Sequence, residues 1–477
     1  MNSCPHCKKA IEVNWSYCHH CDKPLIVNLL KEAISPIENL EIYDEENNNS
    51  TAFHEMLYDP NQTKEEEFRQ RIQDIDYTID QKIIFGESIG SLLLEKASLY
   101  YHKNDLATSL KILESALNSF MDENDLVNIA ISHNEIGLIH EENGFYDDAI
   151  YHFEQATNIL EDAEDYNKLI QTYNNLANIY YILKDIEHSY EYYDKALKLS
   201  EQENLVSEEI KTSSNLVEIL FYLKDYERIE RILKRNLEYF RQRDDIYGVI
   251  VSISKMGKLY YNLGSTHYKQ ADQILREALD LIKKVRTQDV IYKAKLRWEC
   301  FLYLGKVNLA WNKEDLAESF FMRSLESLRN FENESIKECS ILESIAFLYE
   351  VKAEYQKAVE FYSLCYEIFQ KFGNDFEVAS LKYKVAQIYS EYIKEETVAI
   401  KFFEEALEIF KDLKYSKETA EIFHRLGDIY LKRGIIELAL DYFEKAKLYY
   451  LEFQDETNLN VVLSKIKTLI KKDTNIT

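Results

Sequence analysis

The stretch NNLANIYYILKDIEHSYEYYDKAL, from Asn174 to Leu197, decides the fold of this chain. Apolar and small residues recur in it at steps of three and four, as at Leu176, Ile179 and Leu183, which places one apolar stripe on a helix. A second stripe follows after the short turn LKD. The stretch therefore predicts two antiparallel helices, which must stack on neighbouring helices because a single hairpin cannot bury both stripes.

The same pattern recurs nine times, and successive units are separated by 40, 40, 40, 40, 48, 41, 40 and 41 residues. All four prolines lie at or before residue 60, so the following 417 residues can be helical without interruption. Each unit has a first and a second small-residue position, where we expect helix backbones to approach closely. The first positions are Ala97, Gly137, Ala177, Val217, Gly257, Gly305, Ala346, Ala386 and Gly427. The second positions are Ser109, Ala149, Ser189, Ile229, Ala271, Ala317, Ala358, Ala399 and Ala439.

In this order, small-x-x-Tyr followed by Ala-x-x-x-Phe/Tyr-x-x-Ala, the units resemble tetratricopeptide repeats, most clearly at Asn174 to Leu197 and Leu426 to Ala446. The length of these units resembles that of the repeats in the arrays of kinesin light chain and of Rap-type bacterial regulators. The resemblance implies an all-α fold, a right-handed superhelical solenoid of about nine helical hairpins that occupies residues 91–477 and ends in a capping helix. We expect residues 63–90 to form a capping helix at the other end.

One part of the array is irregular. The unit at Val217 has Ile229 and Asn236 where its neighbours have alanine, and the next unit is eight residues longer. The stretch from Val217 to Val285 is therefore a candidate joint between two stacks of repeats. The alternative is sequence variation that a repeat array tolerates without forming a joint.

The N-terminal segment carries two CxxC pairs separated by ten residues, a spacing at which four thiolates can complete a tetrahedral zinc site. The predicted ligands are Cys4, Cys7, Cys18 and Cys21. Residues 1–26 resemble the short zinc ribbons at the N-termini of many prokaryotic proteins. We expect one structural Zn²⁺, since four thiolates leave no open coordination position; a redox dithiol is the alternative.

Residues 27–62 are expected to form a partly helical, acidic and flexible linker. Glu38 to Asp59 hold seven carboxylates and no Lys or Arg, so this part cannot bury enough surface to fold alone. It either tethers the ribbon to the array or acts as a ligand of the array, a layout that resembles the acidic segment ahead of the repeats in kinesin light chain.

Motifs of known enzyme classes are not evident. The chain has only 11 glycines, none in GxGxxG or GxxxxGK spacing, and it contains neither HExxH nor GxSxG. His133 and His140 share a helix face, but His140 stands where neighbouring units carry tyrosine, so we expect packing rather than a metal pair. The sequence predicts a protein that is not an enzyme.

The net charge and the cysteines limit the class of partner and the cellular compartment that suit this chain. A net charge of −27 disfavours nucleic acid and favours a basic or neutral peptide, although solubility alone also accounts for it. No segment resembles a signal peptide or approaches the roughly 20 apolar residues that span a bilayer. Cys300, Cys339 and Cys365 lack mutual CxxC spacing and suit a reducing compartment. We expect a cytoplasmic protein that does not bind membranes.

In repeats of this kind the first helix of each hairpin lines the inner groove. Residues three before, one after and four after the first small-residue position should face a bound peptide, whose backbone can pair with asparagine amides. The candidate peptide-binding residues are Asn134, Asn174, Asn178, Tyr181, Phe221, Lys258 and Tyr261. We predict an interaction scaffold or adaptor that binds a peptide or protein there. The alternative is a regulatory subunit or peptide-responsive regulator that controls a partner enzyme.

Overall fold

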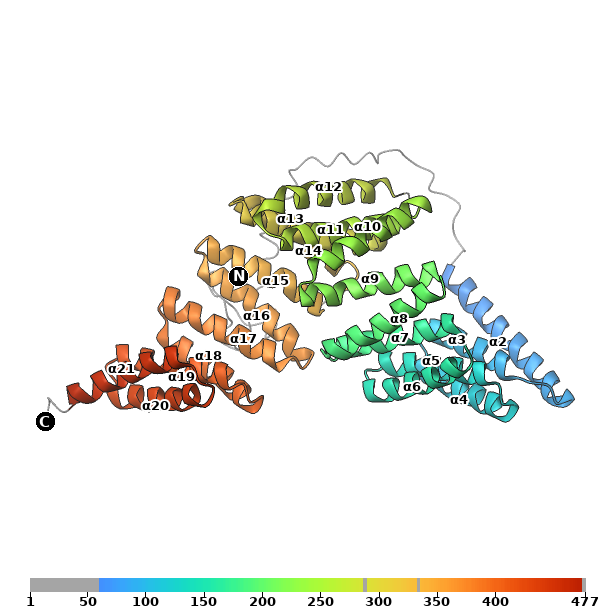
Figure 1. Cartoon of the computed structure of the whole chain (residues 1–477), viewed down its shortest axis with the longest axis horizontal. Coiled ribbons are helices and arrows are strands. Elements are labelled where there is room, and N and C mark those ends of the chain that lie inside the picture. Colours follow the sequence, from blue (N-terminus) through green and yellow to red (C-terminus); the bar gives the residue numbers. More distant parts are fainter. Residues whose placement is uncertain (1–59, 286–289, 333–334, 474–477) are drawn as a thin grey trace. The chain divides into compact units, whose positions relative to one another are not determined.

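The computed structural model describes residues 60–285, 290–332 and 335–473, and every regular element within these ranges is helical. They form twenty α-helices, α2 to α21, a short 3-10 helix and a π-helical turn. Figure 1 shows the helices following one another in pairs. The predicted all-α array of helical hairpins is confirmed, whereas the predicted zinc ribbon, residues 1–26, lies outside the described residues.

Each hairpin consists of a first helix and a second helix, which carry the first and second small-residue positions. In chain order the hairpins are α3 (Gly90–His102) with α4 (Leu106–Glu123), α5 (Leu126–Glu142) with α6 (Tyr146–Asp162), α7 (Tyr166–Ile182) with α8 (Ile186–Gln202), α9 (Val206–Leu223) with α10 (Tyr226–Gln242), α11 (Ile246–Asn262) with α12 (Tyr268–Lys284), α13 (Val290–Ala310) with α14 (Glu314–Arg329), α15 (Ile336–Val351) with α16 (Tyr355–Lys371), α17 (Asp375–Ile388) with α18 (Glu396–Asp412), and α19 (Ser416–Lys432) with α20 (Ile436–Glu452). The helix α2 (Pro60–Phe85) precedes them and α21 (Glu456–Asp473) follows.

The described helices fall into two compact units that divide between Gly248 and Val249, within α11. We call residues 60–248 the first unit and the described residues from 249 onward the second unit. The division lies inside the stretch from Val217 to Val285, where the sequence predicts a joint.

The hairpin of α9 and α10 closes although it lacks a small residue at position 236. Asn236 is buried there, and its Nδ2 donates to the Ser214 hydroxyl at 2.9 Å. Its Oδ1 accepts from the Ser213 hydroxyl at 3.2 Å. Both ends of the buried amide are thus paired with α9, so the polar side chain is accommodated between the helices.

Left-handed residues end the helices at a regular interval. From residue 104 to residue 264, every twentieth residue has a positive φ, a conformation that closes helix C-termini. Aspartates then cap several of the following helices, as where Asp165 accepts the Lys168 backbone N–H and Asp185 accepts that of His188. Because α7 and α8 each have 17 residues and are followed by three-residue turns, two helices account for the 40-residue period.

The small-residue positions bring the two helices of a hairpin together. Every second position is at most 1% exposed. A Cβ atom added to Gly137 would lie 2.7 Å from the Phe153 ring, and one added to Gly427 would lie 2.6 Å from the Phe443 ring. Glycine at these first positions therefore leaves the space that a phenylalanine of the second helix fills.

The hairpin of α17 and α18 contains an extra residue. Its small-residue positions, Ala386 and Ala399, are 13 residues apart, whereas Gly427 and Ala439 in the next hairpin are 12 apart. A π-helical turn, η3 (Tyr389–Ile393), takes up the extra residue. A π-helical turn accommodates an insertion within a helix and keeps the flanking helical residues in register, and such turns are frequent at functional sites.

Candidate functional site

The predicted peptide-binding residues fall into two sets, one in each unit. Asn134 lies on α5, Asn174, Asn178 and Tyr181 lie on α7, and Phe221 lies on α9, all within the first unit. Lys258 and Tyr261 lie on α11 in the second unit. The structure therefore places the first five on successive first helices of one unit, and the other two form part of a separate surface.

In the first unit, uncharged side chains join neighbouring first helices. We call Asn134, Thr172, Asn174, Asn175 and Thr212 the amide–hydroxyl seam. Asn134 Oδ1 on α5 accepts from Asn175 Nδ2 at 3.0 Å and from Thr172 Oγ1 at 3.3 Å, both on α7. Asn174 Nδ2 then donates to Thr212 Oγ1 on α9 at 2.9 Å. The seam thus fixes the first helices of three successive hairpins relative to one another.

The two asparagines with the strongest sequence signal have different surroundings. Asn174 is only 8% exposed, and its buried Oδ1 has no hydrogen-bond partner among the described residues. Asn178 is half-buried, and its Oδ1 accepts from the Tyr193 hydroxyl. Tyr181, one turn further along α7, is exposed, and Phe221 on α9 is half-buried. Asn178 and Tyr181 are therefore accessible to a ligand, whereas Asn174 belongs to the interior of the seam.

In the second unit, a cavity of about 550 Å³ lies beside α11, the first helix that carries Lys258 and Tyr261. Its lining includes Tyr261, Lys306, Glu343 and Phe347. Burial lowers the pKa of Lys306, and the nearby charge of Lys258 adds to this effect. Burial raises the pKa of Glu343. The cavity therefore holds one basic and one acidic side chain in a partly desolvated setting.

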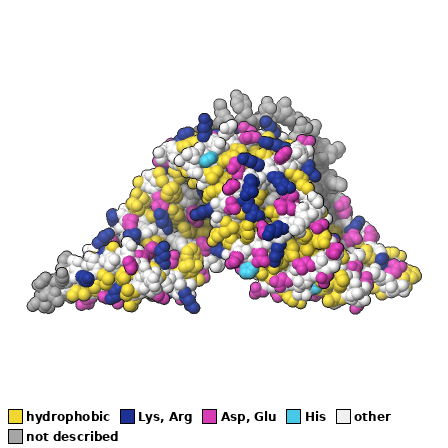
Figure 2. Space-filling model, in the orientation of Figure 1, with side chains coloured by type: hydrophobic (Ala, Val, Ile, Leu, Met, Phe, Trp, Pro, Cys, Tyr) yellow, Lys and Arg dark blue, Asp and Glu magenta, His cyan; other side chains and the backbone are white. Residues whose placement is uncertain are grey.

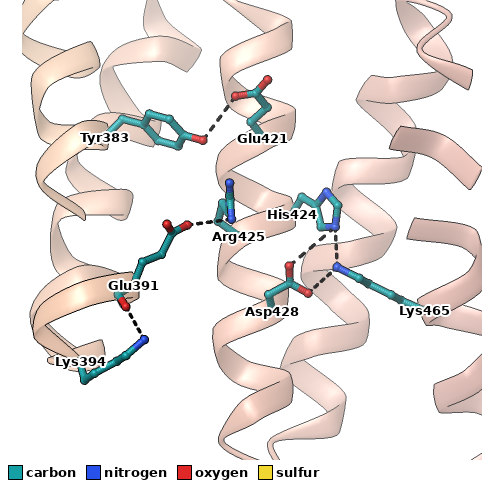
Figure 3. A network of polar contacts seen from close by, with 8 residues as sticks. All are labelled: Tyr383, Glu391, Lys394, Glu421, His424, Arg425, Asp428 and Lys465. Carbon is teal, nitrogen blue, oxygen red and sulfur yellow. Dashed lines mark hydrogen bonds and ion pairs between the residues drawn. The ribbon is translucent and has the colours of Figure 1, made fainter. Parts of the chain in front are cut away.

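Further along the second unit, polar and charged side chains connect α17, the π-helical turn η3, α19 and α21 (Figure 3). Arg425 Nη1 on α19 lies 3.1 Å from Glu391 Oε1 on the π-helical turn. On the other side of α19, Lys465 Nζ on α21 donates to Asp428 Oδ1 at 2.6 Å and to His424 Nε2 at 2.8 Å. Burial lowers the pKa of His424 to about 4, and the charge of Lys465 acts in the same direction. The imidazole of His424 therefore stays neutral, and its Nε2 accepts a hydrogen bond from the ammonium group of Lys465.

A second cavity, of about 370 Å³, adjoins this network. Its polar lining comes from the π-helical turn and from α19, with Gln387 at the end of α17. These lining residues include Gln387, Ser390, Glu391, Arg425, Asp428 and Lys432. The extra residue of this hairpin thus lies in the wall of a polar cavity.

These second-unit residues were not among the predicted site residues, although the sequence holds a signal for them. The predicted set follows the inner-face rule, three before, one after and four after the first small-residue position, only as far as α11. Continued along the chain, the same rule selects Leu302, Lys306, Leu309, Glu343, Phe347, Glu350, Tyr383, Gln387, Ser390, His424, Asp428 and Leu431. Most of them line the two cavities, and Tyr383, His424 and Asp428 belong to the network of Figure 3.

The predicted zinc ligands Cys4, Cys7, Cys18 and Cys21 lie outside the described residues. Within the described ranges, no three His, Cys, Asp or Glu side chains are placed so that they could hold a metal ion. The helices of these ranges are also too short or too polar to cross a lipid bilayer.

Comparison with solved structures finds similar helical arrays. The apo form of the quorum sensor NprR from B. thuringiensis is 13% identical, covers 74% of this chain and all of its own chain, and has a TM-score of 0.50. BtubC (BKLC) from P. vanneervenii is 22% identical over 48% of this chain and 92% of its own, with a TM-score of 0.39. A Rap protein crystallised with Competence and Sporulation Factor is 13% identical over 80% of this chain and 98% of its own, with a TM-score of 0.44.

No curated protein matches this chain. Two family models match parts of it. Residues 338–476 match the model described as soluble NSF attachment protein, SNAP. Residues 88–162 and 128–202 match the model described as tetratricopeptide repeat. The hairpins of residues 88–202 are thus identified as tetratricopeptide repeats, and hairpins of the same helical pattern continue through α20.

Proposed function

We propose that this protein is a non-enzymatic interaction scaffold or adaptor that binds a peptide or a protein along the first helices of its hairpins. The proposal includes the expected right-handed superhelical course of the array, in which the first helices would line a concave groove. The observation that carries it is the amide–hydroxyl seam, which fixes three first helices beside the accessible Asn178 and Tyr181. A rigid row of amide and aromatic side chains suits an extended peptide backbone.

Asn178 is the residue that we assign to backbone recognition. Its Oδ1 is held by Tyr193, and its Nδ2 has no hydrogen-bond partner among the described residues. The Nδ2 group can therefore donate to a peptide carbonyl without breaking an existing bond. Asn174 acts through the seam, because it is buried and bonded to Thr212. Tyr181 supplies an apolar wall beside the amide.

The partner proposed here is a basic or neutral peptide or protein, not nucleic acid or membrane. The net charge of −27 repels polyanions. Figure 2 shows basic and acidic side chains interspersed over the face in view, so local contacts of both signs are available to a peptide. The three cysteines of the described residues are buried free thiols, which agrees with the proposed cytoplasmic location.

Binding is tested first by affinity purification of partners from the native cell, followed by calorimetry with the purified partner. Asn178→Ala should weaken binding by about 1–3 kcal/mol, since it leaves a desolvated peptide carbonyl unpaired. Asn158→Ala, at an exposed site on the second helix α6, is the matched control and should bind as the wild type does. Equal affinity of Asn178→Ala and wild type would place the interface elsewhere.

The second candidate function is a peptide-responsive regulator that controls a partner enzyme. Its support is the similar helical array of NprR, which is described as a quorum sensor. A short peptide would then change the dimensions of the chain, whereas a scaffold would retain a folded partner without such a change. Small-angle scattering with and without a bound peptide separates the two functions.

The proposed cofactor is one structural Zn²⁺ held by Cys4, Cys7, Cys18 and Cys21. Its support is the paired CxxC spacing, since thiolates at this spacing bind zinc strongly enough to fold a small domain. Elemental analysis should find one zinc per chain in protein never exposed to a chelator and none after Cys18→Ser with Cys21→Ser. A zinc content near zero in the wild type would remove this assignment.

A further inference from the structure

Three histidines meet in the hairpin formed by α5 and α6. The Nδ1 atoms of His133 on α5 and His152 on α6 lie 2.9 Å apart. The rings of His140 and His152 stack, with centroids 5.4 Å apart and an interplanar angle of 15°. The packing predicted for His133 and His140 is thus observed, and His152 joins them from the opposite helix.

The same three places all hold aromatic residues in two other hairpins. They stand four before and three after the first small-residue position, and three after the second. In the hairpin of α7 and α8 they are Tyr173, Tyr180 and Tyr192, whose rings stack or tilt at 5.6 and 5.9 Å. In the hairpin of α19 and α20 they are Phe423, Tyr430 and Tyr442, at 5.4 and 6.1 Å. One hairpin has thus exchanged a complete aromatic cluster for histidine, in a chain with only 11 histidines among 477 residues.

This exchange makes the cluster titratable. Two Nδ1 atoms at 2.9 Å hold one proton between them, because one nitrogen donates and the other accepts. His133 is 8% exposed, and His140 Nδ1 is buried with no hydrogen-bond partner among the described residues. A second proton would therefore place two N–H groups, or two positive charges, against each other in a partly buried site.

The surroundings offer little compensation for added positive charge. On α6, Asp148 raises the pKa of His152, but burial together with His133 and His140 lowers that pKa to about 4. Glu142 on α5 is already bonded to the Tyr101 hydroxyl of α3. The helix α4 packs the apolar Leu113 against α5, and α7 presents the uncharged seam residues Thr172 and Asn175 to it.

We propose that His133, His140 and His152 form a proton sensor that loosens the hairpin of α5 and α6 in mild acid and so weakens binding at the amide–hydroxyl seam. The binding consequence rests on the proposed function, because α5 carries Asn134 of the seam. Burial lowers the pKa of His133, and the pKa of His152 is lowered to about 4, so the stabilising effect of His152 is fully present above pH 6.5 and is lost as the pH falls toward about 4. The titration of His152 changes the opening equilibrium by up to about tenfold per pH unit within this window.

Hydrogen exchange of the full chain, corrected for the intrinsic pH dependence of exchange, tests the sensor. Between pH 7.5 and pH 5.5 the opening equilibrium of α5 and α6 should rise about tenfold in the wild type, while that of α7 and α8 changes little. The variant His133→Tyr with His140→Tyr and His152→Tyr copies the neighbouring hairpin and should abolish the response. His188→Gln, at an exposed histidine on α8, should leave it unchanged. The single variant His152→Tyr serves if the triple variant does not fold.

Two results would overturn the proposal. The first is an acid response that is absent in the wild type or equally large in the tyrosine variant. The second is protection of α5 and α6 by added Ni²⁺ or Zn²⁺ that the tyrosine variant lacks, since the cluster would then be a metal site. If peptide binding were absent at every pH while the exchange response persisted, the sensor would stand and the proposed function would fall.

Discussion

In the first unit, neighbouring first helices are joined by amide and hydroxyl groups, whereas in the second unit ion pairs join α19 to the π-helical turn η3 and to α21. Asn174 and Thr212 represent the first kind of contact, and Lys465 with Asp428 represents the second. Both kinds join first helices, but at different positions of the repeat: Asn174 stands three before the first small-residue position of its hairpin, and Asp428 stands one after. A repeat architecture therefore fixes where the inner surface lies and leaves its chemistry to individual side chains.

The two kinds of contact should respond differently to solution conditions. Hydrogen bonds between uncharged groups are not screened by salt, but half-exposed ion pairs weaken as ionic strength rises. Histidine adds a response to acid in both units, through the triad on α5 and α6 and through His424 on α19. Variants in each unit can therefore show whether the chemical difference matters for stability.

The largest effect on the free energy of unfolding is expected at the first small-residue positions, where the two helices of a hairpin pack against each other. Gly427→Ala should destabilise the second unit by up to about 3 kcal/mol, because its Cβ would lie 2.6 Å from the Phe443 ring. Ala177→Gly, at the same position of the first unit, should cost only about 0.5–1 kcal/mol. Urea unfolding of both variants checks the difference, and a cost of Gly427→Ala no larger than that of Ala177→Gly would contradict the expected clash with Phe443. Phe443→Leu in the Gly427→Ala background should restore part of the loss.

The next effect concerns the amide–hydroxyl seam. Thr212→Val should cost about 1–3 kcal/mol, because it removes the partner of a buried amide whose Oδ1 is already unpaired. The cost should be the same in 0.05 and 1 M NaCl by urea unfolding. Thr78→Val, at an exposed threonine of α2, is the matched control with little expected effect. A cost that falls sharply with salt would contradict an uncharged contact.

Acid should next loosen α21 from α19. The pKa of folded His424 is about 4, below the ordinary histidine value, so its stabilising effect is complete above pH 6.5 and is lost as the pH falls toward 4. Between pH 7 and pH 5 we expect a loss of about 1–2 kcal/mol in the docking of α21. Hydrogen exchange of α21 measures it. His424→Gln keeps a hydrogen-bond acceptor for Lys465 but does not titrate, so an undiminished acid response in this variant would exclude His424 as the cause.

The smallest effect is expected at the ion pair itself. Asp428→Asn should cost about 0.5–1 kcal/mol at low salt, because Lys465 and Asp428 are about a third exposed. In 1 M NaCl the cost should fall toward zero, in contrast to Thr212→Val. Urea unfolding at both salt concentrations provides the comparison. If Asp428→Asn cost more than Thr212→Val, the ion pair would stabilise the protein more than the seam hydrogen bond does, which is the opposite of the expected order.

Much of the fold could be predicted from the sequence because each hairpin contacts mainly its neighbours. The spacing of small residues located all nine hairpins, and the irregular residues near Val217 and Val285 marked the stretch in which the two units divide. The inner-face rule selects residues of the first helices, on which the candidate site lies. It failed at Asn174, which the rule places facing a ligand but which lies 8% exposed within the seam. Sequence spacing gives the direction of a side chain from its own helix, not the partner that covers it.

The sequence by itself determined the helices, their turns and the close approach within each hairpin, since these follow from local periodicity and from residue size. Only the tertiary structure decided which side chains meet between hairpins. Asn134 pairs with Asn175, and Lys465 with His424, each across 41 residues. The same is true of His152, which meets His133 only because α6 folds back on α5. Such contacts depend on the side-chain conformations of stacked helices, so the same repeat supports a seam, a charged network or a titratable cluster.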